Sequence, residues 1–334
     1  MATPILPPDE DLGFHRFRNE GFPVYSLNRD QRRKALQRLL RYDRTQLIKG
    51  GVLSQTMHGL ALAWHYHPHA FTIRCGKMLT PQEVFGDDDR LRNSLKRRLK
   101  LGSCLTQSDL RKALKTFSGA QGVSNFRPTA AAAIYDRYLP ERGGVTWDMS
   151  SGFGGRLLGA IASSRVLKYI GTDPATLTMD GLLEMSDDLP SMAEQFGFPN
   201  PEIELHKMGS EDFAPDRNSV DLAFTSPPYW NTEKYSDEQT QSYIKFPSKE
   251  EWLNGFMAQT LANCHYSLVK DGMLVINIAN VPTYPALADD FVALASRIGF
   301  KLQECLRLAL SALPGTRNGE SHKYEPILAF VKTG

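Results

Sequence analysis

Two spacings of apolar residues alternate along the second part of the chain. Short apolar runs of the kind that form buried strands occur at 145–148, 169–172, 202–206, 220–225, 273–278, 301–310 and 326–331. Between most of them, apolar residues three and four positions apart predict helices at 156–163, 179–196, 248–269 and 286–298. Ser248 and Glu251 form a capping-box pair, and Gly272 stands where the third helix is expected to end. This alternation predicts an α/β domain with a mostly parallel sheet.

The first 120 residues have a different pattern. Residues 1–28 are rich in Pro, Gly and aromatic residues without a period, which predicts an irregular arm. Helical spacing with many basic residues occurs at 29–44, 90–100 and 108–117, whereas 64–69 predicts strand or loop. We therefore divide the chain into a basic, mainly helical region at 1–120 and an α/β domain at 121–334.

The charge supports this division. Residues 1–120 hold 21 Lys and Arg against 11 Asp and Glu, a net +10, although the whole chain carries only +2. The remainder holds 18 basic and 26 acidic residues, a net −8. A polyanion would be steered to the basic end. One basic helix alone is more often a solvated face, but three of them favour contact with phosphates.

Several classes of protein are disfavoured. No apolar run is long enough to cross a membrane, and the first residues lack a signal-peptide pattern. The four cysteines form no CxxC pair, so we expect reduced cysteines and a cytoplasmic protein. His65, His67 and His69 alternate, but no second ligand cluster accompanies them and we expect no metal site.

A glycine-rich turn follows the first strand. It reads Asp148-Met149-Ser150-Ser151-Gly152-Phe153-Gly154-Gly155. Glycines let the backbone approach a ligand and bring the next helix N-terminus towards it. Asp173, at the end of the second strand, is where ribose hydroxyls would be held. A nucleoside cofactor, a nicotinamide dinucleotide and a turn without any ligand are all open at this point.

A second motif, Thr225-Ser226-Pro227-Pro228-Tyr229-Trp230, follows the fourth strand. Ligands bind at this edge of open α/β sheets, although a proline-stiffened loop needs no ligand. An exocyclic base amine is a poor nucleophile, and its two hydrogens need acceptors that favour a tetrahedral nitrogen. The Ser226 hydroxyl and the Pro227 carbonyl supply two acceptors, and the prolines restrict that carbonyl because they fix φ. Tyr229 offers a face on which a flipped base can stack.

These residues resemble the amino-group DNA methyltransferases. Thr225–Tyr229 is similar to the family's catalytic TSPPY motif in the form associated with N4-cytosine enzymes, whereas adenine-N6 members more often carry Asp or Asn in place of Ser226. Asp148–Gly154 matches the spacing of the DPFxGxG cofactor motif, with Met and Ser in place of Pro and Phe. Asn125–Pro128 is similar to the NFxP segment that contacts the methionine end of the cofactor. The resemblance covers roughly 123–334.

The resemblance implies a class I methyltransferase fold with a mixed seven-stranded sheet, and S-adenosylmethionine as cofactor. The catalytic residues would be Ser226, Pro227, Pro228 and Tyr229. The residues implied in cofactor binding are Asn125, Phe126, Pro128, Asp148, Ser150, Ser151, Gly152, Gly154, Asp173, Ser210, Asp212 and Thr225. Ser210 departs from the Asp that commonly reads the cofactor's adenine, so Glu211 or Asp212 would substitute for it.

We therefore expect a DNA methyltransferase that modifies N4 of a flipped cytosine in a specific sequence of double-stranded DNA. Adenine N6, or a base in RNA, is the nearest alternative, and a catalytically inactive DNA-binding regulator of the same fold is another. Cytosine-C5 chemistry needs a thiolate, and none of the cysteines stands in a Pro-Cys setting. A cognate restriction endonuclease, and hence a restriction–modification system, is a partner that the sequence leaves open.

Overall fold

The computed structural model describes residues 10–312 and 322–333, which form two compact units. The helical unit holds the residues up to Ser26, residues 68–124 and the short segment 233–235. The α/β unit holds residues 27–67, 125–232 and those from Ser236 onward. The chain thus returns to the α/β unit close to the expected division at residue 120, but 27–67 packs with that unit as well. A role of 1–120 as the DNA-recognition region stays a prediction.

Seven strands of the α/β unit come from the chain after residue 140. They are β4 (Gly144–Asp148), β5 (Val166–Thr172), β6 (Glu202–His206), β7 (Val220–Thr225), β9 (Leu268–Asn277), β10 (Phe300–Ala312) and β11 (His322–Lys332). They stand in the order β6-β5-β4-β7-β9-β11-β10. Six of these strands run in the same direction, and β11 runs in the opposite direction between β9 and β10. This order defines the class I methyltransferase fold and confirms the expected mixed sheet.

Two short strands enlarge the sheet beyond the expected seven. β1 (Ile48–Lys49) and β2 (Val52–Leu53) form a hairpin, and β2 pairs in parallel with β10. The described sheet therefore has nine strands. The sequence did not reveal this pair because two-residue strands are too short to show a period.

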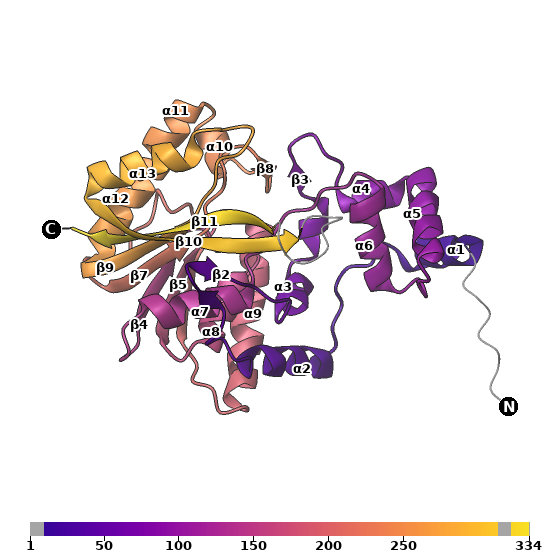
Figure 1. Ribbon diagram of the computed structural model, residues 1–334, viewed down its shortest axis with the longest axis horizontal. Helices are drawn as coiled ribbons and strands as arrows, with labels where there is room; N and C mark the ends of the chain where they lie inside the picture. Colours follow the sequence, from indigo (N-terminus) through magenta and orange to yellow (C-terminus); the bar gives the residue numbers. More distant parts are fainter. Residues whose placement is uncertain (1–9, 313–321, 334) are drawn as a thin grey trace. The chain divides into compact units, whose positions relative to one another are not determined.

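Helices cover both faces of the sheet (Figure 1). On one face lie α7 (Pro128–Tyr138), α8 (Gly155–Ala162) and α9 (Thr176–Glu194). On the other lie α11 (Lys249–Glu251), the π-helical turn η2 (Trp252–Met257), α12 (Ala258–Ser267) and α13 (Leu287–Ile298), with the short α10 (Ser242–Lys245) before them. Two hydrophobic clusters correspond to these two layers. The capping box of Ser248 and Glu251 is present.

The expected helix end at Gly272 was wrong. The helix ends at Ser267, and Gly272 lies inside β9. Leu268 is fully buried and pairs with Val220 of β7, so tertiary packing starts the strand earlier than the glycine suggests. By contrast, Gly299 ends α13 with a φ of +113°, in the left-handed conformation that favours glycine after a helix.

The helical unit packs around a small core of its own. It contains α1 (Glu10–Glu20), η1 (Pro68–Thr72), β3 (Arg74–Cys75), α4 (Pro81–Gly86), α5 (Asp88–Lys100), α6 (Gln107–Phe117) and β8 (Glu233–Lys234). Phe14 and Phe17 of α1 are buried in that core. The irregular arm expected at 1–28 is therefore wrong for 10–20, because two aromatic residues three apart suffice to bury one face of a helix.

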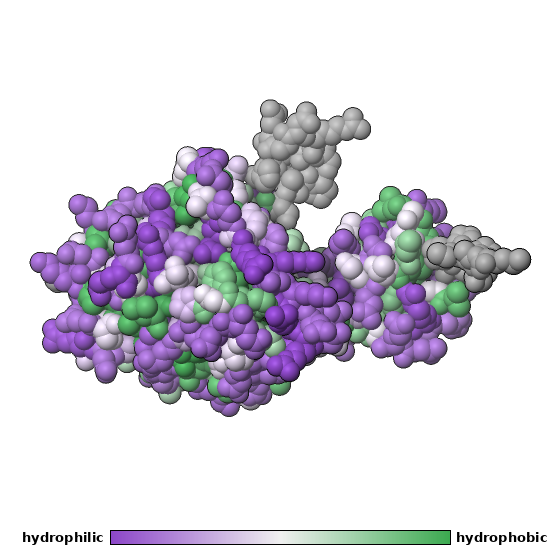
Figure 2. Space-filling view, turned by 90° about the horizontal axis from the view of Figure 1, so that it is seen from below, coloured by the Kyte–Doolittle hydropathy of each residue, from purple (hydrophilic) through white to green (hydrophobic). Residues whose placement is uncertain are grey.

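The segment 27–67 supplies two helices to the α/β unit, α2 (Arg29–Leu40) and α3 (Leu60–Tyr66). Asn28 and Gln31 form a capping box at the start of α2. Arg32 is ion-paired with Asp188 of α9 at 2.9 Å, so one of the basic residues of α2 joins this helix to the rest of the α/β unit. No helix in residues 10–312 or 322–333 has the length and apolar character to cross a membrane. The face of the α/β unit seen in Figure 2 is mainly hydrophilic, with small separate hydrophobic patches.

Candidate active site

The glycine turn joins β4 to α8 and needs glycine for two separate reasons. Gly154, which precedes the helix, has a φ of +72°, a conformation that L side chains rarely adopt. At Gly155 a Cβ atom would lie 1.9 Å from the carbonyl oxygen of Phe126. The turn can lie against residues 125–128 only with glycine at both positions.

The segment Asn125–Pro128, which the resemblance implies in cofactor binding, is bonded to this turn. Asn125 is buried, and its Nδ2 donates a hydrogen bond to the Phe153 carbonyl at 2.9 Å. Phe126 packs edge to face on Phe224 of β7, with ring centroids 5.4 Å apart. Pro128 begins α7, where its missing N–H costs no helical hydrogen bond. These contacts fix the position of the segment, and the Asn125 side-chain amide is already hydrogen-bonded to the protein.

Asp173 lies beside the turn, directly after β5. Its Oδ2 accepts a hydrogen bond from the Gly152 amide at 2.9 Å, and its Oδ1 accepts one from the Ala175 amide at 3.0 Å. Burial raises the pKa of this carboxyl to about 6, although both amide hydrogen bonds lower it. Each oxygen keeps a second acceptor position. Asp173 therefore lies next to Gly152, and its carboxylate can still accept hydrogen bonds from a ligand.

Ser210, Glu211 and Asp212 follow β6, where the sequence predicts the adenine contact. The Ser210 hydroxyl is buried and lies 2.8 Å from the hydroxyl of Thr260 on α12. Lys245 binds the other two, with its Nζ 2.6 Å from Glu211 Oε1 and 2.5 Å from Asp212 Oδ2. The second Glu211 oxygen, Oε2, is buried and has no hydrogen-bond partner in the described part of the chain. Glu211 is thus the residue with an unused buried acceptor.

The TSPPYW motif follows β7, which pairs with β4, so its loop and the glycine turn meet at one edge of the sheet. Ser226 is half-buried, and its hydroxyl forms no hydrogen bond with any residue that the structure describes. Pro227 is buried and Pro228 half-buried. Trp230 has a φ of +52°, an uncommon conformation for a bulky residue that occurs preferentially at functional sites.

Tyr229 is held by the neighbouring strand. Its hydroxyl donates a hydrogen bond to the Asn277 carbonyl at the end of β9, at 3.2 Å. The Asn277 side chain in turn donates to the Pro326 carbonyl of β11 at 3.2 Å, and it lies 3.4 Å from Glu325 Oε2. Burial raises the pKa of the Glu325 carboxyl. The ring of Tyr229 is therefore anchored through β9 and β11 beside the serine.

Asp148 and Thr225 are buried and bonded to each other, with Thr225 Oγ1 2.8 Å from Asp148 Oδ1. Sequence reasoning missed two further partners, Arg156 and Tyr169, which bond Asp148 at 2.9 and 2.7 Å. The only signal for Arg156 is that it is the single charged residue of the apolar helix α8. Ser151 is also buried, with its hydroxyl 3.3 Å from that of Tyr169.

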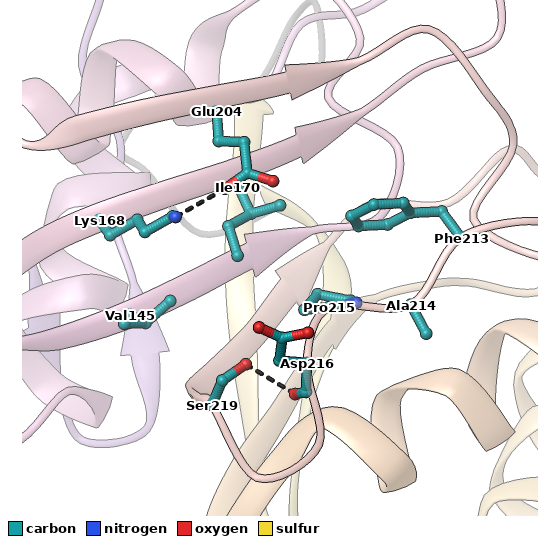
Figure 3. Close-up of a pocket in the computed structure, with 9 residues that line it drawn as sticks. All are labelled: Val145, Lys168, Ile170, Glu204, Phe213, Ala214, Pro215, Asp216 and Ser219. Atoms are coloured by element: carbon teal, nitrogen blue, oxygen red, sulfur yellow. Dashed lines mark hydrogen bonds and ion pairs between the residues drawn. The ribbon is translucent and has the colours of Figure 1, made fainter.

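A hollow of about 210 Å³ lies elsewhere on the α/β unit (Figure 3). It is lined by Lys168, Glu204, Asp216 and Ser219, among others. Residues 207–219, between β6 and β7, contain no helix to cover this face of the sheet. Lys168 is ion-paired with Glu204 at 2.6 Å. Because Val145, near the start of β4, also lines it, the hollow lies away from the turn that follows Asp148.

The alternating histidines do not share a strand. His65 lies in α3, His67 follows that helix, and His69 lies in η1. His67 is fully buried, and its ring nitrogens contact the carbonyl oxygens of Ala63 and Thr178 at 3.0 and 3.3 Å. In residues 10–312 and 322–333, no group of three or more His, Cys, Asp or Glu side chains is arranged to hold a metal ion.

Comparison with known families gives one match in sequence. Residues 220–334 match the family model N6_N4_Mtase, described as DNA methylase. The match begins at β7 and includes the whole TSPPYW motif, but it covers only about a third of the chain. No curated protein matches the chain significantly.

Solved methyltransferases are similar to the chain at low sequence identity. One is a TehB-like SAM-dependent methyltransferase from Corynebacterium glutamicum, with 19% identity over 63% of this chain and 90% of that one, at a TM-score of 0.37. A SAM-dependent methyltransferase from Methanosarcina mazei has 12% identity over 60% and 97%, at 0.40. A 16S rRNA (adenine(1408)-N(1))-methyltransferase from Catenulisporales acidiphilia has 14% over 64% and 96%, at 0.38.

Proposed function

We propose that the chain is an S-adenosylmethionine-dependent DNA methyltransferase that acts on an exocyclic base amine, N4 of cytosine. The observation that carries this proposal is the direct bond between the two predicted loops, from the Ser150 amide to Thr225 Oγ1 at 3.1 Å. Transfer between two bound molecules requires their reacting atoms to be held a few ångströms apart. The match of residues 220–334 to DNA methylase supports the class of substrate.

The residues at the glycine turn fit a nucleoside cofactor. Asp173 keeps acceptor positions for ribose hydroxyls, and Glu211 Oε2 is a buried acceptor that an adenine amino group would satisfy. Leaving such an acceptor unpaired is costly, so a donor from a ligand would relieve it. When bound, S-adenosylmethionine supplies an electrophilic methyl group on a sulfonium. Among the residues predicted after β6, we assign the adenine contact to Glu211 in preference to Ser210 and Asp212.

Ser226 and Pro227 would prepare the amine. The Ser226 hydroxyl has no partner within the described residues, so it is available to accept one amine hydrogen. The Pro227 carbonyl accepts the other, and both favour a nitrogen whose lone pair is localised for attack. Tyr229 stacks on the base, which must leave the duplex at a cost of a few kcal/mol. The methylated nitrogen then releases one proton to water, so no strong base is needed.

The base identity is tested by the product. Oligonucleotides are incubated with the purified chain and labelled cofactor, and the modified nucleosides are identified by mass spectrometry. We expect N4-methylcytosine. N6-methyladenine as the only product would contradict the cytosine assignment but keep the enzyme class. Absence of any product, together with no cofactor binding in calorimetry at millimolar concentration, would leave a DNA-binding regulator of the same fold.

The role of Ser226 is tested by Ser226→Ala. Loss of one preorganised hydrogen bond in a transition state lowers turnover by about 10²- to 10³-fold. We expect kcat to fall by that order while the Kd of the cofactor, measured by calorimetry, stays unchanged. Ser219→Ala is the matched control, because Ser219 lies in the same unit and its hydroxyl donates to the Asp216 carbonyl of its own loop. Equal losses of kcat and cofactor affinity would contradict the assigned role.

A further inference from the structure

A buried ion pair lies directly beneath the two loops of the candidate site. Arg156 Nε of α8 is 2.9 Å from Asp148 Oδ2, the last residue of β4, and the two side chains are only 6% and 0% exposed. Burying a charge pair costs much desolvation energy unless further hydrogen bonds satisfy both groups. We therefore expect further hydrogen bonds from neighbouring residues to both members of this pair.

The remaining acceptor positions of Asp148 are occupied by two neighbouring strands and by the glycine turn, whose Ser150 amide lies 3.4 Å from Oδ1. The Tyr169 hydroxyl of β5 donates to Oδ2 at 2.7 Å, and the Thr225 hydroxyl of β7 donates to Oδ1 at 2.8 Å. Burial and the charge of Asp148 raise the pKa of Tyr169 well above its usual value, which keeps its hydroxyl a donor. Asp148 thus ties together three adjacent strands and α8, and its carboxylate is saturated by the protein.

The same network holds both loops. Thr225 immediately precedes Ser226, and its oxygen also accepts the Ser150 amide of the glycine turn at 3.1 Å. Arg156 donates from Nη2 to the carbonyl of Ser150. The peptide groups on both sides of Ser150 are therefore bonded, one to the residue before the catalytic serine and one to the guanidinium.

We propose that Thr225, Asp148 and Arg156 form a brace that sets the distance between the cofactor-binding turn and the amine-binding motif. This inference rests on the proposed function. The three are positioning residues, because their side chains are used within the protein and the brace acts through Ser150 and Ser226. A brace of this kind affects alignment of the reacting atoms, to which transfer rates are very sensitive. It leaves the contacts with the ribose and adenine of the cofactor intact.

The test compares three variants in single-turnover methyl transfer and in cofactor titration. Thr225→Val keeps the side-chain shape but removes the hydroxyl, and we expect the transfer rate to fall by about 10²-fold with a cofactor Kd within about twofold of wild type. Thr225→Ser restores the hydroxyl and is expected to recover most of the rate. Thr146→Val is the matched control: the Thr146 hydroxyl is equally buried and also joins β4 to β7, through the Leu222 carbonyl at 3.0 Å.

Thermal unfolding shows whether each variant is folded, and Thr225→Ala, which also removes the hydroxyl, replaces Thr225→Val if that variant fails to fold. A wild-type transfer rate in the hydroxyl-deficient variant, or an equal loss with Thr146→Val, overturns the brace while the proposed function stands. If the wild-type chain binds the cofactor but methylates no DNA, both the proposed function and the brace are contradicted. Loss of rate with Thr225→Val, rescue with Thr225→Ser and no effect of Thr146→Val support the brace.

Discussion

At the scale of single residues, the two buried aspartates of the site differ in what their neighbours leave unused. Asp148 accepts hydrogen bonds from Arg156, Tyr169 and Thr225, and it is fully buried. Asp173 accepts only two backbone amides, and its carboxyl has a pKa raised to about 6 by burial. Although both were predicted to bind the cofactor, Asp173 is the one whose ionisation should affect binding.

We expect cofactor affinity to depend on pH through Asp173. Ribose hydroxyls donate to the carboxylate more strongly than to the neutral acid, so binding favours the ionised form. The pKa of the Asp173 carboxyl in the free protein is about 6. The affinity for the cofactor should therefore be constant above pH 7 and weaken by about tenfold for each pH unit below 6. Calorimetric titration between pH 5 and 8 measures this directly. A flat profile for the wild-type chain would show that ionisation of Asp173 does not affect binding, and a slope that survives in Asp173→Asn would assign the dependence to another group.

At the scale of elements, the basic helices fall into two groups. Asp188, which binds Arg32 of α2, is twelve residues into α9, about 18 Å along a helix that begins at the site edge of the sheet. The cations of α2 therefore lie towards the other end of the α/β unit. In the helical unit, Lys96 and Lys100 of α5 and Lys112 of α6 are exposed. No carboxylate in the described residues is ion-paired with these three.

DNA affinity should accordingly depend on α5 and α6 more than on α2. We expect the triple variant Lys96→Ala, Lys100→Ala, Lys112→Ala to weaken binding to all DNA sequences alike. The slope of log K against log salt should decrease by about 0.9 for each lost phosphate contact. The control is the triple alanine variant of three exposed cations, Lys34 and Arg38 of α2 and Arg41 directly after it. A larger change of slope in the control would instead place the main phosphate contacts on α2.

At the scale of the whole molecule, the α/β unit is assembled from separate stretches of chain. Residues 27–67 contribute Leu36, Leu39 and Leu53, all fully buried, to the main hydrophobic cluster. Burial of one such side chain stabilises a fold by about 1.5–3 kcal/mol. Since a domain is stable by only about 5–15 kcal/mol in total, the unit depends on this segment.

We predict that residues 121–334 alone do not fold cooperatively. A variant that begins at residue 27, with 68–124 replaced by a flexible linker, keeps the hydrophobic cluster and should fold and bind the cofactor. It should lose most of its DNA affinity. Circular-dichroism melts, cofactor calorimetry and DNA titration of both variants check this. Cooperative unfolding and cofactor binding by 121–334 would show that the segment 27–67 is dispensable.

The sequence by itself determined where seven strands and the two candidate site loops of the α/β unit lie, because apolar spacing and motifs are local properties. The strands at 202–206 and 220–225 begin and end at the predicted residues, and the glycine turn and TSPPYW loop lie at the expected ends of strands. Only the tertiary structure decided that Arg156 binds Asp148, that Ser210 turns to Thr260, and that 27–67 joins the α/β unit. Each of these depends on which side chains meet after burial, and residues far apart in the chain leave no local pattern of their pairing.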